Sequence, residues 1–329
     1  MTGATVPLSP LLFLHKPDCS AGAALEYSVP VQVLQETSAR MRKKISLVVP
    51  AILGLMAVGS RPALAAATAA LCNSQLSASI PERSPNAPSG DAFMRQIQGK
   101  SADERELAIL EQLLAGDIPA FLRHLQPVHL SASGAPGRED LVVCVCPDYL
   151  AIGSDEDFFL VPMRLATALT VARRFGFVLP TRKIVDDIYR QARTRLPPQP
   201  LPASDQMRST AYYWAHNDLV AEQRAQELSV LGLLTAGDKK DLVLTNRLWT
   251  HPGRVAIYGW HRPDGIPIQP LSTVHGLRYA DYSHGVRLVS QTAYVDGRAR
   301  SMLDLLRNPR TAAGVSDEGP LRGVGSLLR

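Results

Sequence analysis

The sequence predicts an α+β fold: a single mixed domain with a central sheet and a helical N-terminal prelude. Some segments repeat apolar residues at the spacing of an amphipathic helix, and others are short, apolar and rich in β-branched residues, as strands are. The chain has 329 residues, of which 46% are hydrophobic and 20% charged. This composition is ordinary for a folded protein and excludes collagen-like, coiled-coil and multi-span membrane classes.

The prelude is predicted from a helix start signal. Ser101 to Glu104 has the pattern of a capping box, in which serine and glutamate bind each other's backbone N–H groups. Leucines then recur at helical spacing as far as Gly116, and a second short helix is expected over about 118–125. Residues 66–100 have turn and linker composition, so we expect them to form a flexible lead-in.

The middle of the chain combines one strand with two helices. The apolar run 141–146 predicts a strand buried on both faces, and helical patterns follow at about 162–175 and 181–195. Thr181 is the expected cap of the second helix, with an ion pair from Arg182 to Asp186 four residues on.

The prolines at 197–202 predict an extended surface connection, because proline removes a backbone donor and disfavours helix. Beyond them the sequence predicts a helix over 216–231, strands at 241–245, 254–259 and 286–295, a turn at 296–297 and a final helix near 299–307. The central sheet is expected to include 141–146, 254–259 and 286–290.

The N-terminal part has the pattern of a secretory signal peptide. The basic residues of 41–44 precede a short apolar run, 45–58, and a small-residue cleavage site at Ala63 to Ala65. The apolar run is too short to span a bilayer and contains Pro50, so no integral membrane span is expected after processing. We therefore expect cleavage after Ala65 and a periplasmic or extracellular location.

Four segments follow from this interpretation. Met41 is the expected true start, which makes residues 1–40 an over-annotated upstream segment. Residues 41–65 are the signal peptide, 66–100 the lead-in and 101–329 the mixed globular domain.

The mature chain keeps three cysteines. Export to an oxidising compartment permits one disulfide, expected between Cys72 and either Cys144 or Cys146, with one thiol left over. Cys144 and Cys146 are two apart in a strand and so are poorly placed to bond each other.

The net charge of +5 does not indicate nucleic-acid binding. Residues beyond 65 hold 29 basic and 27 acidic side chains, a net charge of only +2. A basic stripe with interleaved aromatic residues, which binding to a phosphate backbone requires, is absent there.

The strongest functional signal is a concentration of histidines: five of the eight lie within the 69 residues from His216 to His284. Polar and aromatic side chains accompany them, and such residues build binding and catalytic sites. The candidate catalytic residues are His261, His275, Asp281, Ser283 and His284. The candidate substrate-binding residues are His216, Asn217, Lys240, Tyr258, Trp260 and Tyr282.

Two chemistries fit these residues, and the sequence leaves both open. His261, His275, Asp281 and His284 supply the ligand types of a catalytic zinc site, so the cofactor is either none or a divalent metal such as zinc. Alternatively one histidine is the base, Asp281 orients it, and Ser283, Ser272 or a tyrosine hydroxyl is the nucleophile or acid. The motifs H-E-x-x-H and G-x-S-x-G are absent.

Two adjacent lysines, Lys239 and Lys240, allow a second interpretation of the same region. They could offer ammonium groups to an anionic substrate, although a solvated lysine pair on a turn is the more common arrangement.

These features predict a secreted hydrolase that acts on a glycan, peptide or ester polymer of the envelope or the extracellular space. The alternative is a non-catalytic envelope or carbohydrate-binding protein that uses the same aromatic residues. The oligomeric state does not follow from the sequence.

Two sets of sequence strings carry resemblances. VAIYGWH (255–261) and DYSHG (281–285) resemble a family of uncharacterised exported bacterial proteins; this covers most of the mature chain and implies no activity. GRVAIYGWH and HGVRLV are similar, over these few residues, to the strand around the catalytic histidine of NlpC/P60-type cell-wall peptidases. That family uses a cysteine nucleophile at a helix start upstream, whereas Cys146 here precedes Pro147 in a strand-like run.

Overall fold

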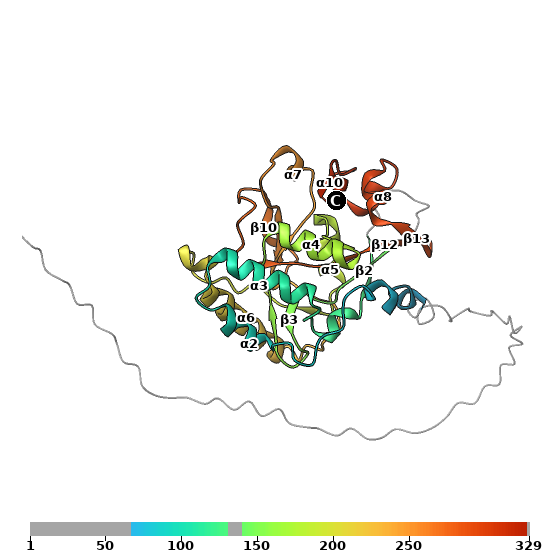
Figure 1. Cartoon of the computed structure of the whole chain (residues 1–329). Coiled ribbons are helices and arrows are strands. Elements are labelled where there is room, and N and C mark those ends of the chain that lie inside the picture. The colour runs from blue at the N-terminus through green and yellow to red at the C-terminus, as the bar shows by residue number, and fades with distance from the viewer. Residues whose placement is uncertain (1–66, 131–139, 328–329) are drawn as a thin grey trace, which may run out of the picture. The chain divides into compact units, whose positions relative to one another are not determined.

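A computed structural model describes residues 67–130 and 140–327 of the chain, and it confirms the α+β fold (Figure 1). The predicted signal peptide and the segment before it lie outside the described residues. In the part of the chain that is described, no helix is both long and apolar enough to cross a membrane.

The larger sheet is built around two buried strands. Its order is β1-β2-β12-β13, with β5 also paired to β12, and all of these pairs are antiparallel. The strands are β1 (Gln126–His129), β2 (Leu141–Val145), β5 (Phe177–Val178), β12 (Val289–Val295) and β13 (Arg298–Ser301). The strand predicted at 141–146 is confirmed, and the predicted turn at 296–297 joins β12 to β13.

A second, four-stranded sheet carries most of the candidate site residues. Its order is β10-β9-β8-β11, and β11 runs parallel to β8. The strands are β8 (Lys240–Leu242), β9 (Ile257–His261), β10 (Pro267–Ser272) and β11 (His284–Gly285). The prediction that 254–259 shares one central sheet with 141–146 is therefore wrong, because an apolar strand pattern does not specify which strand pairs with it.

Two further pairs of short strands complete the β-structure of the described residues. One pair is antiparallel and the other parallel. They are β3 (Ala151–Gly153) with β4 (Phe158–Leu160), and β6 (Thr194–Arg195) with β7 (Thr235–Ala236).

Predicted helix caps are present where the local pattern was strongest. Ser101 and Glu104 form the capping box of α3 (Ala102–Leu114), which lies beside α4 (Leu165–Phe175) (Figure 1). Thr181 caps α5 (Arg182–Gln191) by accepting from the backbone of Ile184. The expected second prelude helix is only a 3₁₀ turn, η2 (Ala120–Arg123).

The helix predicted from His216 begins earlier, at Thr210. Its cap is Ser209, whose hydroxyl accepts from the backbone of Tyr212, and the helix is α6 (Thr210–Gln226). The prolines at 197–202 form neither helix nor strand and are half-buried or exposed, as expected. The other helical elements are η1 (Ser74–Ser77), η3 (Asp205–Arg208), α7 (Arg247–Thr250), α8 (Met302–Arg307), α9 (Ala312–Val315) and α10 (Val324–Leu327).

The described part of the predicted flexible lead-in is instead folded. Helix α2 (Gly90–Ile97) buries Phe93, Met94 and Ile97 in the core. Gly90 lies so close to β4 that an added Cβ atom would come within 2.6 Å of the Phe158 backbone. The linker composition hid one amphipathic turn and a half of helix, so the globular domain begins before residue 101.

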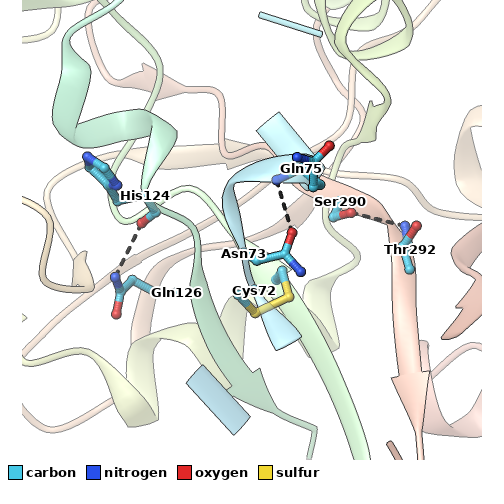
Figure 2. Close-up of a disulfide and its surroundings, with 8 residues drawn as sticks. Cys72, Asn73, Gln75, His124, Gln126, Ser290 and Thr292 are labelled. Carbon is cyan, nitrogen blue, oxygen red and sulfur yellow. Dashed lines mark hydrogen bonds between the residues drawn. A yellow bond between two sulfur atoms is a disulfide. The ribbon is translucent and has the colours of Figure 1, made fainter. Parts of the chain in front are cut away.

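A disulfide ties the same region to the larger sheet. Cys72 bonds to Cys144 on β2, with the two Cα atoms 5.4 Å apart, while Cys146 is free and buried (Figure 2). Beside it, Asn73 caps η1 by accepting from the backbone of Gln75 (Figure 2). The prediction of one disulfide from Cys72, with one thiol left over, is confirmed.

Candidate functional site

Three of the four side chains central to the predicted site converge. The His275 ring stacks on Tyr279, with ring centres 3.8 Å apart, and the Tyr279 ring lies 5.7 Å from the His284 ring. The Tyr279 hydroxyl donates to Asp281 Oδ2 at 2.9 Å. His275, Asp281 and His284 therefore form one cluster, which we call the His284 cluster together with Lys239, Lys240, His216, Tyr279 and Ser283.

The carboxylate of Asp281 is held firmly in this cluster. Ser283 donates to Asp281 Oδ1 twice, from its backbone N–H at 2.9 Å and from its hydroxyl at 2.5 Å. Burial opposes the charged form, but His284, Lys240 and these bonds outweigh it and lower the pKa of Asp281 to about 2. The hydroxyl of Ser283 is therefore engaged with a carboxylate and not with an imidazole, which gives Ser283 a positioning role instead of a nucleophilic one.

His284 lies on β11, beside Lys240 of β8 in the parallel pair. Its side chain is fully buried, and Nε2 is 3.9 Å from Asp281 Oδ2. Neither ring nitrogen has a hydrogen-bond partner among the described residues. Burial lowers the pKa of His284 to about 4, so the imidazole is neutral at neutral pH and able to accept a proton.

Both lysines of the Lys239–Lys240 pair face this cluster. Lys239 is fully buried, and its ammonium donates to His216 Nδ1 at 3.1 Å and to the Tyr282 carbonyl at 2.7 Å. Lys240 is half-buried, with its ammonium 5.1 Å from the centre of the Trp260 ring. The arrangement as a solvated lysine pair is therefore wrong.

The two buried bases on this side are both uncharged or readily uncharged. Burial lowers the pKa of Lys239 to about 8. Burial, followed by the charge of Lys239, lowers the pKa of His216 to about 2, so His216 stays neutral. Because an ammonium group only donates, Nδ1 of His216 accepts, and its proton is on Nε2.

His261 does not join the cluster. Its Nε2 is 3.0 Å from Asp186 Oδ1, and the Tyr258 hydroxyl donates to the same oxygen at 2.8 Å. Its ring stacks on Tyr189 of α5 with ring centres 4.5 Å apart. These side chains line a surface pocket of about 400 Å³, together with Arg190, Arg195, Pro263, Asp264, Gly265 and Pro267.

A break in strand alternation explains why His261 and Trp260 lie apart. Gly259 and Trp260 both have positive φ angles, 107° and 57°. A Cβ atom on Gly259 would lie 3.6 Å from the His261 ring and 3.4 Å from Val185 of α5, which places His261 on the α5 side of the sheet. Trp260 instead packs against His216, with ring centres 6.0 Å apart.

Asp186 is the functional-site candidate that the sequence did not reveal. Its spacing from Arg182 indicated an ion pair along the helix, but Arg182 pairs with Asp317 instead. Asp186 binds residues that follow it by more than 70 positions, and no local pattern signals such a contact.

The predicted aromatic binding wall is not on the surface. Tyr258, Trp260 and Tyr282 are 6%, 3% and 1% exposed, and the Tyr282 hydroxyl is bound to the backbone of Leu201. These rings form the interior wall of the His284 cluster and of the His261 pocket, so they offer no open face on which a sugar ring could stack. Asn217 supports the backbone of β4, accepting from Leu160 at 3.0 Å.

The ligand set expected for zinc is not assembled, because His261 is bound to Asp186 instead. Among residues 67–130 and 140–327, no three His, Cys, Asp or Glu side chains are grouped closely enough to hold a metal ion. Burial raises the pKa of the Cys146 thiol to about 12, so this cysteine is protonated at neutral pH and is not a nucleophile.

Comparison with known proteins adds no family: no family model, no curated protein and no solved structure matches this chain. The chemistry of the His284 cluster therefore has to be inferred from its geometry.

Proposed function

We propose that the protein is an exported hydrolase that cleaves acyl linkages, peptide or ester, in a polymer of the envelope or the extracellular space. The observation that carries this proposal is the position of His284, a neutral imidazole with two unpartnered nitrogens beside a fixed carboxylate. A base in this form can take a proton from water, and the neighbouring carboxylate stabilises the imidazolium that results.

The proposed reaction needs only the side chains of the cluster. His284 removes a proton from a water molecule, and the water oxygen bonds to the carbonyl carbon of the substrate. The carbonyl electrons move to its oxygen, where the ammonium of Lys240 stabilises the negative charge. When the oxygen–carbon double bond re-forms, the leaving group departs with the proton that His284 returns.

The composition of the cluster favours acyl linkages over glycosidic ones. Glycosidases use a pair of carboxyl groups on either side of the bond that is cleaved. Among the described residues, the contacts of His284 include one carboxylate, that of Asp281. The cluster instead offers ammonium and imidazole groups, which suit a carbonyl oxygen that gains charge.

A substrate reaches this cluster from the side where exposure remains. His275, Tyr279 and Lys240 are half-buried, whereas His284, Asp281 and their other neighbours are buried. The guanidinium group of Arg208 extends this side, with its central carbon 5.5 Å from the centre of the Tyr279 ring.

Two features support an extracytoplasmic location. The sequence has the three parts of a signal peptide, and the Cys72–Cys144 disulfide is a bond that persists in oxidising compartments. N-terminal sequencing of the secreted protein should give a chain that begins at Ala66. Cytosolic material with Met1 intact would contradict export.

The activity is tested by incubating the purified protein with a peptide cross-linked polymer, a polyester and a glycan, and measuring released fragments. We expect release from a peptide or ester polymer and none from the glycan. His284→Gln should abolish release, while His251→Gln, at an exposed histidine, should not change it. Binding to a polymer without release would favour the non-catalytic alternative, and release only from the glycan would contradict the acyl chemistry.

A further inference from the structure

The His284 cluster contains more hydrogen-bond donors than the protein itself uses. Trp260 Nε1 and His216 Nε2 are buried and have no partner among the described residues, as are both nitrogens of His284. Trp260 and His216 can only donate at these atoms, and a neutral His284 donates at one of its two. Each buried polar group left unpaired costs about 1–3 kcal/mol, so an external acceptor is the simplest explanation for their arrangement.

The charges of the cluster point the same way. Lys239 and Lys240 carry two positive charges, and Asp281 supplies one negative charge. On the other side of Lys239, Asp148 and Asp238 both approach Arg224.

Those two aspartates also feel the charge of the buried Arg287, so two carboxylates there are matched by two guanidinium groups. Asp241, next to Lys240 in sequence, lies on the α5 side of the sheet, near Val185, and accepts from Tyr149. The cluster is therefore left with an excess of one positive charge.

We propose that this site binds a carboxylate group of the substrate at Lys240, with the unpartnered N–H groups of Trp260 and His216 as further donors. The inference rests on the proposed function, because it names the kind of substrate that the hydrolase takes: one with a carboxylate near the bond that is cleaved. A carboxylate has two acceptor oxygens and no donor, which matches a set of donors without acceptors.

The excess charge selects a monoanion over a dianion. A carboxylate neutralises the excess of one positive charge, whereas a phosphate dianion would leave a negative charge in a mostly buried site, which is costly. A neutral amide or hydroxyl group would leave the ammonium group of Lys240 without a counter-charge.

The test is isothermal titration of the full chain with small probes and needs no turnover. N-acetylalanine presents a peptide carboxylate and glucuronate a sugar carboxylate; N-acetylalaninamide, glucose and inorganic phosphate are the controls. We expect at least one carboxylate to bind about tenfold or more tightly than its neutral counterpart and than phosphate. The better of the two identifies the source of the carboxylate.

Variants separate this inference from the activity. Lys240→Gln should weaken carboxylate binding about tenfold or more, while Lys100→Gln, at an exposed lysine, should leave it unchanged. His284→Gln should retain carboxylate binding and lose hydrolysis. Equal binding of carboxylate and amide, or tighter binding of phosphate, by the wild-type protein overturns the inference even if hydrolysis is observed.

Discussion

The disulfide between Cys72 and Cys144 should contribute a large part of the stability of this domain. It closes a loop of 72 residues, and loop-closure entropy then predicts a stabilisation of roughly 4 kcal/mol. Domains of this kind are stable by only about 5–15 kcal/mol. The bond also fixes the segment before α2, which the sequence composition alone would leave flexible.

We expect dithiothreitol to lower the free energy of unfolding of the wild-type protein by roughly 4 kcal/mol in urea titrations followed by circular dichroism. Cys72→Ser should show the same loss without reductant and no further loss with it, because its remaining thiols form no bond in the described fold. A reduced protein that unfolds within about 1 kcal/mol of the oxidised one would refute the reasoning. So would a loss confined to the segment before α2 while the rest unfolds at an unchanged urea concentration.

Two further predictions concern the core and the histidines. Phe93→Ala should destabilise the protein by about 3–5 kcal/mol, because Phe93 on α2 is fully buried; a loss below 1 kcal/mol in the same urea assay would show that α2 is not part of the core. Below pH 6.5 the unfolded chain protonates His284 while the folded chain does not until about pH 4, so stability falls with decreasing pH between these values. His284→Gln should reduce that slope by about 1.4 kcal/mol per pH unit, and an unchanged slope would mean that the folded imidazole is not kept neutral.

Local features were predictable from the sequence because they depend on neighbours a few residues away. The caps at Ser101 and Thr181 are satisfied by backbone groups within three residues, and the hairpin turn at 296–297 is equally local. The flexible lead-in failed for the opposite reason. The apolar face of α2 is short and is stabilised by contacts with β3 and β4, which lie more than 50 residues later.

The site was predictable as a group of residues but not as a geometry. His275, Asp281 and His284 lie within ten residues, so one loop and a short strand bring them together. His261 lies only 14 residues before His275, yet the backbone at Gly259 and Trp260 turns it to the other side of the sheet. The pairing of Asp186 with His261 spans 75 residues and depends on the packing of α5 against β9.

The central claim is that the His284 cluster, and not the His261 pocket, carries out the reaction. The most direct test is the kcat of His284→Gln beside that of His261→Gln, on the polymer that the wild-type protein cleaves and with folding checked by circular dichroism. Loss of a general base predicts a fall of about 10²–10⁴-fold for His284→Gln, and we expect a change of less than about threefold for His261→Gln. The reverse order, with His261→Gln inactive and His284→Gln active, would contradict the account.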